Sequence, residues 1–250
     1  MSTTTLDRSP VATTPLTPRT RVVTGILLIS AAVLAATGAA WLSAAFGWPD
    51  VLDAPGTEAL SSFAANESAV RTAFYLLLVS SLVLIPVAIY LEELFGGPGR
   101  PAVRMVTAFG VLGGFAQILG WVRWPVTVPH LSDAYAAAEG ANGGAIASSY
   151  DVLNRYAGGA LGEHLGWLFQ GLWAVGIGIL LLRVVGVPRW FALLGLGLAV
   201  LWLPMLWGSG LFAAEWLAPI GSTISGVWYV WLLALGVIVM VRRVSPASST

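Results

Sequence analysis

The sequence predicts an all-α, polytopic membrane protein with six transmembrane helices and both termini in the cytoplasm. Three observations lead to this prediction. Of the 250 residues, 57% are hydrophobic and 10% are charged, and the mean hydropathy is +0.83, whereas about a quarter of the residues in a soluble domain are charged. Six apolar runs follow one another, each long enough to cross a hydrocarbon core of about 30 Å. The arginines gather in alternate connections between these runs.

The six runs cover residues 22–46, 72–91, 105–126, 159–182, 191–211 and 220–241. No run alternates apolar and polar residues as a membrane β-barrel requires, and backbone polar groups in lipid must be satisfied within the segment, so the runs are expected to be helices. The first run exceeds the about 7–15 apolar residues of a signal peptide, which predicts an uncleaved helix. We therefore expect a disordered cytoplasmic tail at residues 1–20, a six-helix domain at 21–243 and a short cytoplasmic tail at 244–250.

Arginine placement sets the predicted orientation. Nine arginines fall on the side of the termini, and three, Arg71, Arg123 and Arg155, fall on the other. Because cytoplasmic loops carry the excess of positive residues, both termini are predicted to be cytoplasmic. The arginine-only, alanine- and glycine-rich composition favours a bacterial cytoplasmic membrane. The outer connections, 47–71 and 127–158, are the longer ones; the second is expected to be a loop with short interfacial helices, and any site is expected in the outer half.

Composition excludes several function classes. The chain has no cysteine, hence no disulfide, thiolate metal site or cysteine nucleophile. It has no lysine, hence no Schiff-base chemistry with a bound chromophore. A formal net charge of zero does not favour nucleic acid as a partner. No nucleotide-binding, serine-hydrolase or zinc-protease motif is present, so the sequence favours a non-enzymatic protein.

The third and fourth predicted helices carry most of the polar residues that could form a site. The residues that share one face are Gly113, Gln117, Gly120, Trp121 and Trp124 on the third helix, and Glu163, Gly166, Trp167 and Gln170 on the fourth. Small residues on a face let helices approach closely, and amides there can bond across the interface. This pattern favours helix packing held by Gln117 and Gln170; the alternative is that these residues line a ligand site.

Arg123 and Glu163 form the second candidate. At about 1.5 Å per residue, Arg123 lies roughly 9 Å outward of Gln117, and Glu163 lies about 10 Å outward of Gln170. If the two glutamines share a level on antiparallel helices, so do Arg123 and Glu163. The sequence then allows either an interfacial arginine within a tryptophan belt or a buried Arg123–Glu163 pair at the outer mouth of the bundle.

The two histidines, His130 and His164, are predicted to lie at neighbouring helix ends near the outer face. Two imidazoles there could hold one haem axially, or a metal together with Glu163. The pair lacks regular helical spacing, however, so a structural or proton-handling role is the favoured interpretation and no metal ligand is assigned.

Several segments resemble a bacterial family of six-helix integral membrane proteins that carries only the label of a domain of unknown function. They are GGALGEHLGWLFQGLW at residues 158–173, the turn Arg183-x4-Pro188-Arg189, and the pair Arg123-Trp124-Pro125 and Val128-Pro129-His130. Val184 and Ala192 depart from the family pattern, which often has serine and glycine there. The resemblance, from about Arg21 to Arg243, implies the fold and the membrane location; it implies no activity, ligand or catalytic residue.

These observations predict an integral membrane protein whose partners are the lipid bilayer and either an apolar or amphipathic small molecule or a membrane protein, bound in the outer half. Three alternatives stay open. One is a small-molecule transporter, the second is a haem- or metal-binding redox protein, and the third is an intramembrane enzyme that uses Glu163 and His164 as acid and base.

Overall fold

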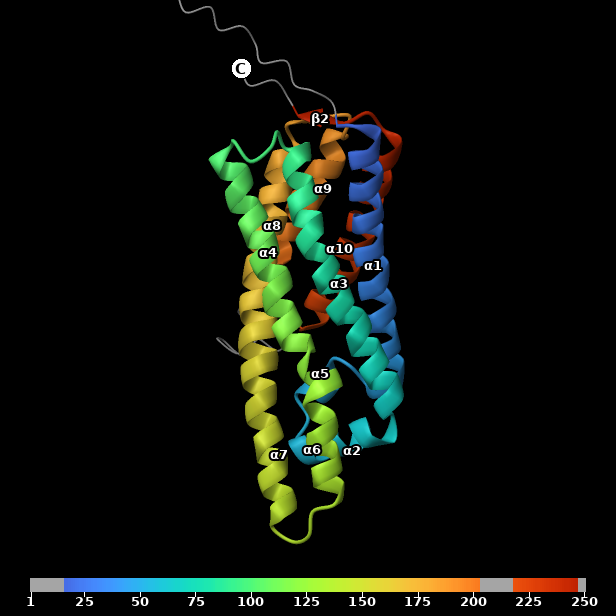
Figure 1. Ribbon diagram of the computed structural model, residues 1–250, viewed down its shortest axis with the longest axis vertical. Helices are drawn as coiled ribbons and strands as arrows, with labels where there is room; N and C mark the ends of the chain where they lie inside the picture. The colour runs from blue at the N-terminus through green and yellow to red at the C-terminus, as the bar shows by residue number, and fades with distance from the viewer. Residues whose placement is uncertain (1–15, 203–217, 247–250) are drawn as a thin grey trace, which may run out of the picture.

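The computed structural model describes residues 16–202 and 218–246, and nearly all of these belong to helices (Figure 1). The long elements are α1 (Pro18–Phe46), α3 (Glu67–Leu94), α4 (Pro101–Trp121), α8 (Gly166–Leu181), α9 (Arg189–Trp202) and α10 (Ala218–Val241). The shorter ones are η1 (Asp50–Leu52), α2 (Gly56–Ala65), α5 (Arg123–Val126), α6 (Val128–Ala136), α7 (Asn142–Leu153) and η2 (Asn154–Leu165). Two strands, β1 (Val184–Val185) and β2 (Ser245–Pro246), pair antiparallel.

The predicted all-α polytopic bundle is confirmed. Five helical segments are long and apolar enough to cross a membrane, and α9 is a shorter apolar helix. The fifth predicted run continues to residue 211, and its part from 203 onward lies outside the described residues. Neighbouring helices pack in the order α1, α3, α4, α8, α9 and α10, and α10 returns to α1. The result is an up-and-down ring, because long helices that follow one another along the chain are also neighbours in the bundle.

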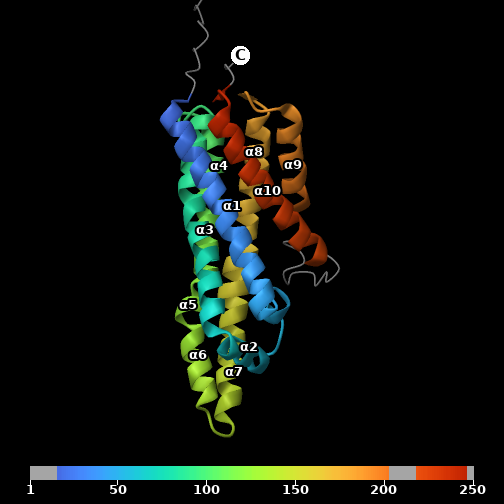
Figure 2. The same cartoon turned by 90° about the vertical axis from the view of Figure 1, so that its right-hand side faces the viewer.

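The two ends of the described chain lie at the same end of the bundle (Figures 1 and 2). α1 begins at Pro18, inside the predicted tail, because the Thr17 side chain accepts a hydrogen bond from the Thr20 N–H at 3.1 Å and proline suits the first turn. At the other terminus, β2 pairs Pro246 with Val184, within the predicted second tail. The remainder of both predicted tails, residues 1–15 and 247–250, lies outside the described residues.

Arg21 joins the two terminal helices, and its removal should measurably weaken the bundle. Its Nε and Nη2 donate to the carbonyls of Val239 and Met240, at 3.2 and 2.6 Å, in the last turn of α10. A cation there satisfies orphan carbonyls and opposes the helix dipole. We expect Arg21→Met to lower the free energy of unfolding in detergent by about 2–3 kcal/mol. Arg19→Met, an exposed neighbour, should have little effect; equal losses would show that the carbonyl contacts contribute nothing.

The largest difference from the prediction concerns residues 127–158, where a loop with short interfacial helices is expected. Helices do form there, as α6 and α7, but they continue the third and fourth spans into a helical hairpin that extends past the ends of the other long helices and packs against α2 (Figure 1). The fourth helical segment runs over 40 residues, Asn142–Leu181, about 60 Å at 1.5 Å per residue, so it extends past a hydrocarbon core of about 30 Å. Alanine is the best helix former, and Gly140, at φ +59°, makes the turn.

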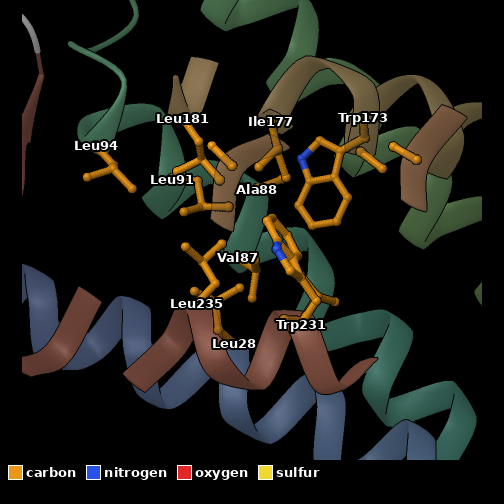
Figure 3. Packing of buried hydrophobic residues seen from close by; sticks show 14 of the residues in the cluster. Leu28, Val87, Ala88, Leu91, Leu94, Trp173, Ile177, Leu181, Trp231 and Leu235 are labelled. Atoms are coloured by element: carbon orange, nitrogen blue, oxygen red, sulfur yellow. The ribbon is translucent and has the colours of Figure 1, made fainter. Parts of the chain in front are cut away.

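Apolar side chains fill the half of the bundle that holds the termini (Figure 3). Leu28 of α1, Val87 and Leu91 of α3, Ile177 of α8 and Leu235 of α10 converge there, and all are at most 1% exposed. The Trp231 indole donates to the carbonyl of Phe191 at 3.0 Å and stacks on its ring. A second apolar cluster, which includes Leu42, Phe63 and Trp124, fills the other half, and most of the buried polar side chains lie around it.

Candidate functional site

A line of buried and half-buried polar side chains, here called the polar seam, joins α3, α4 and α8. It consists of Ser81, Gln117, Trp121 and Gln170. Ser81 Oγ donates to Gln117 Oε1 at 3.1 Å, and the Trp121 indole donates to Ser81 Oγ at 3.2 Å. Gln117 Nε2 donates to Gln170 Oε1 across the interface between α4 and α8. The hydrogen bond between the two side-chain amides, which the helix-packing interpretation predicts, is therefore present. Gln170 Nε2 is buried without a hydrogen-bond partner.

Glycines bring these helices into close contact and set their register. A Cβ on Gly120 would lie 2.7 Å from Gly162 Cα, and one on Gly113 would lie 3.1 Å from the backbone nitrogen of Gln170. A Cβ on Gly166 would lie 3.0 Å from Gln117 Cγ. The backbone of Gln117 thus lies opposite Gly166, about one turn away from the level of Gln170, and the two amides meet because their side chains reach along the interface.

The seam makes a prediction about stability. Gln117→Leu should lower the free energy of unfolding by about 1–3 kcal/mol, because it leaves the Gln170 carbonyl oxygen buried and unpaired. Adding Gln170→Leu should cost less than the sum of the two single changes, with a coupling of about 1 kcal/mol, since both orphaned groups are then gone. Reversible unfolding in detergent measures all three variants. Strict additivity would contradict a hydrogen bond between the two amides.

Arg123 lies on the outward side of the seam and is the only charged side chain among the buried residues of the described chain, with 3% of its surface exposed. Its Nη2 donates to Asn154 Oδ1 at 2.9 Å, and its Nη1 donates to the carbonyl of Gly120. Asn154 in turn donates through Nδ2 to the carbonyl of Leu52 at 2.9 Å, which ties η2 to the connection after α1. Arg123 Nε has no hydrogen-bond partner.

An aromatic cluster packs around this arginine, and its members come from α1, α2, α3, α4, α5 and α7. The members are Phe46, Phe63, Phe74, Trp121, Trp124 and Tyr150. Trp124 is its centre, stacked on Phe74 at 4.4 Å between centroids and edge-on to Tyr150 at 6.1 Å. The guanidinium carbon of Arg123 lies 5.3 Å from the Trp124 ring centroid, within cation–π range. We call Arg123, Trp124, Tyr150 and Asn154 the arginine site.

The predicted Arg123–Glu163 pair is wrong. The one ion pair formed by the described residues joins Arg71 to Glu67 at 2.8 Å. Glu163 is half-buried and within electrostatic range of Arg123, but the guanidinium extends outward to Asn154. The reason is the register of the two antiparallel helices. Gly120 faces Gly162, so Glu163 lies close to the level of Gly120, whereas the backbone of Arg123 lies about three residues further outward. From there the Arg123 side chain extends away from Glu163. The alternative of an arginine in an interfacial belt is also wrong, because Arg123 and Trp124 are buried.

The helical segment that faces Arg123 has an unusual geometry that sequence reasoning missed. η2 is a π-helix of 12 residues, Asn154–Leu165, between α7 and α8. π-helical segments are rare and occur often at functional sites. Three glycines, at positions 158, 159 and 162, were the available signal. A Cβ on Gly158 would collide with the Arg123 guanidinium, which would then have to leave its hydrogen bonds to Asn154 and to the Gly120 carbonyl. Tyr150 on α7 and Asn154 on η2 were also missed as site residues, because residues 127–158 were expected to be a loop with short interfacial helices and not a continuation of the fourth span.

The histidines do not converge. His130 is exposed on α6, and His164 is half-buried within η2 rather than at a helix start. Since Gly120 faces Gly162, His130 lies about 15 Å outward of that level and His164 about 3 Å inward, at about 1.5 Å per residue. This separation does not favour a single haem held by both. Residues 16–202 and 218–246 contain no group of three histidine or acidic side chains able to hold a metal.

The remaining predicted site residues also lie apart from one another. Trp167 is half-buried against the apolar core of the other half, edge-on to Trp202 at 6.5 Å between ring centroids. Glu163 and His164 are consecutive in η2, and consecutive helical side chains do not face each other. The structure therefore brings together Gln117 with Gln170, and Arg123 with Trp124 of the predicted face and with Asn154, which was not predicted. The functional roles of all seven predicted residues stay predictions.

Fold and site together define a polytopic helical integral membrane protein with a buried cation in the half of the bundle away from its termini. Within that class, the chain belongs to the family described as "Domain of unknown function (DUF4386)", whose model matches residues 23–236. The family resemblance seen in the sequence is thus confirmed. No curated protein and no solved structure matches the chain.

Proposed function

We propose that this membrane protein binds an amphipathic small molecule at the arginine site, with an anionic head group on Arg123 and an apolar body against the aromatic cluster. The observation that carries the proposal is the burial of Arg123, 3% exposed, with no acidic side chain of the described chain in an ion pair with it. A buried charge without a counter-charge is costly, and an intramembrane arginine is a functional-site candidate for that reason.

Further polar atoms support an acceptor-rich head group. Arg123 Nε, Trp124 Nε1 and the Tyr150 hydroxyl are all buried without a hydrogen-bond partner. Buried donors are nearly always paired, and these three side chains are contiguous, because Arg123 and Tyr150 both contact the Trp124 ring. The Arg123 and Trp124 nitrogens can only donate a hydrogen bond, and the Tyr150 hydroxyl can also donate one. A carboxylate, phosphate or sulfate, which accepts hydrogen bonds, therefore fits these groups better than a donor group does.

The proposal is tested with a pair of probes that differ only in the head group, dodecanoate and 1-dodecanol. In nanodiscs, we expect dodecanoate to raise the Tm of the protein more than dodecanol does; about 2.7 kcal/mol of added stability corresponds to a concentration of 100 Kd. Arg123→Gln should abolish the difference. Arg155→Gln, which removes an exposed arginine from the same η2 segment, should keep it.

Tyr150→Phe provides a second test if Arg123→Gln does not fold. It removes one hydroxyl and should weaken dodecanoate binding severalfold while leaving dodecanol unaffected. The proposal would be overturned if both probes raised the Tm of the wild-type protein equally. It would also be overturned if Arg155→Gln lost the difference between the two probes as completely as Arg123→Gln does. Anionic amphiphiles that copurify in mild detergent and are absent from Arg123→Gln would identify the natural ligand by mass spectrometry.

We also propose that the termini face the cytoplasm of a bacterial cell. Nine of twelve arginines flank the end of the bundle that holds the termini, or precede α1 in the chain, which supports this orientation. The chain has no cysteine, so single cysteines report without background. In intact cells, an impermeant thiol reagent should label Glu58→Cys and Glu139→Cys and spare Gly99→Cys. The opposite labelling pattern would reverse the orientation.

A further inference from the structure

The end of the bundle that holds the termini carries a concentrated, unneutralised positive charge. The helix ends there place eight described arginines together: Arg19, Arg21, Arg100, Arg104, Arg183, Arg189, Arg242 and Arg243. Two acids, Glu92 and Glu93, lie at the same end, and neither forms an ion pair with an arginine of the described chain. We call this surface the basic end. Its net charge favours an anionic partner.

A small cleft lies within the basic end, between the α3–α4 turn and the end of α8. Its volume is about 60 Å³, and Arg100 and Arg183 line it together with apolar residues that include Ala102, Val103 and Leu180. Arg183 is exposed, and the one hydrogen bond that the Arg100 side chain makes within the described chain is a long one, from Nη1 to the Phe95 carbonyl at 3.4 Å. Most of the donors of both guanidinium groups are therefore free to bind an anion in the cleft.

The position of the cleft indicates what kind of anion would occupy it. The cleft lies where two apolar spans end, at Pro101 and Leu181, and the ends of membrane-spanning helices lie near the polar head groups of the lipids. One turn into the span, exposed apolar side chains continue from it, Met105 at 55% and Ile179 at 46% exposed. An exposed apolar surface beside the cleft can contact the acyl chains of a lipid, whereas a soluble anion has no apolar part that would bind there. Guanidinium groups match phosphate oxygens in bidentate geometry.

We infer that the cleft between Arg100 and Arg183 binds the phosphate of an anionic phospholipid, while the other arginines of the basic end attract that lipid to the surface. This site lies at the opposite end of the bundle from the arginine site and does not depend on the function proposed there. The inference predicts a preference for phosphatidylglycerol over phosphatidylcholine, because the choline cation cancels the phosphate charge near a positive surface.

The test is a lipid titration of the full-length protein in a non-ionic detergent, with Tm as the readout. Phosphatidylglycerol should raise the Tm of the wild type at lower concentration than phosphatidylcholine does. Arg100→Gln/Arg183→Gln should weaken the apparent affinity about 25-fold, at about fivefold per arginine. The matched control, Arg71→Gln/Arg155→Gln, removes two exposed arginines from the other end and should keep the wild-type affinity.

Two further variants separate the cleft from the general charge of the basic end. Ala102→Leu keeps every arginine but fills the cleft, and it should lose most of the preference, which also covers the case in which the double arginine variant does not fold. Arg242→Gln/Arg243→Gln should lose less of the preference for phosphatidylglycerol than the cleft variants do. The inference is overturned if the wild type shows no preference for phosphatidylglycerol, or if Ala102→Leu keeps that preference. It is also overturned if Arg71→Gln/Arg155→Gln loses as much affinity as Arg100→Gln/Arg183→Gln, or if inorganic phosphate at millimolar concentration raises the Tm as much as phosphatidylglycerol does.

Discussion

Gly158→Leu should destabilise the protein by about 4 kcal/mol or more, or prevent folding altogether. A Cβ at this position would lie 2.4 Å from Arg123 Nη2 and 2.7 Å from its Cζ. The guanidinium is held in place by Asn154 and by the Gly120 carbonyl. Overpacking alone costs about 1–3 kcal/mol, and a buried charge separated from its partners costs about 3–5 kcal/mol. Both penalties apply here because the side chain cannot move without losing its hydrogen bonds.

The adjacent glycine provides the control. A Cβ on Gly159 would meet nothing within 4 Å, so Gly159→Leu should change the free energy of unfolding by less than about 1 kcal/mol, and the higher helix propensity of leucine should offset part of any loss. Unfolding followed by tryptophan fluorescence in a fixed detergent compares the two variants directly. If Gly158→Leu is tolerated as well as Gly159→Leu, Arg123 is not confined in the way that the structure describes.

Asn154→Leu should lower the free energy of unfolding by about 3 kcal/mol, whereas Glu163→Gln should lower it by about 1 kcal/mol or less. The leucine removes an acceptor for a charged donor, worth about 1.5–3 kcal/mol, and a donor to the Leu52 carbonyl, worth about 0.5–1.5 kcal/mol. Glu163 makes no ion pair with any described residue, so its neutralisation removes only a distant attraction to Arg123.

Double-mutant cycles identify the true partner of Arg123. Arg123→Met combined with Asn154→Leu should cost less than the sum of the single changes, with a coupling of about 1.5–3 kcal/mol. Arg123→Met combined with Glu163→Gln should be nearly additive. A strong coupling with Glu163 and none with Asn154 would restore the pair predicted from the sequence and reject the observed hydrogen bond.

The sequence was sufficient to predict the class of protein and the faces on which its helices pack. The membrane spans were predicted from the length of the apolar runs. The contact faces were predicted from the helical spacing that places the glycines and the two glutamines on one side of each helix. For that reason the long helices α1, α3, α4, α8 and α10, and the Gln117–Gln170 bond, agree with prediction.

The tertiary structure decided which residues meet, because contact between two helices depends on their relative register, which no single helix encodes. A register of Gln117 opposite Gly166, about one turn from the predicted pairing with Gln170, directs Arg123 to Asn154 in place of Glu163. Tyr150 and Asn154 reach the site because α7 and η2 continue the fourth span, with α7 packed against α2 and η2 packed against α4. Composition and periodicity therefore determined the membrane bundle, while the buried arginine site arose from how its helices are placed against one another.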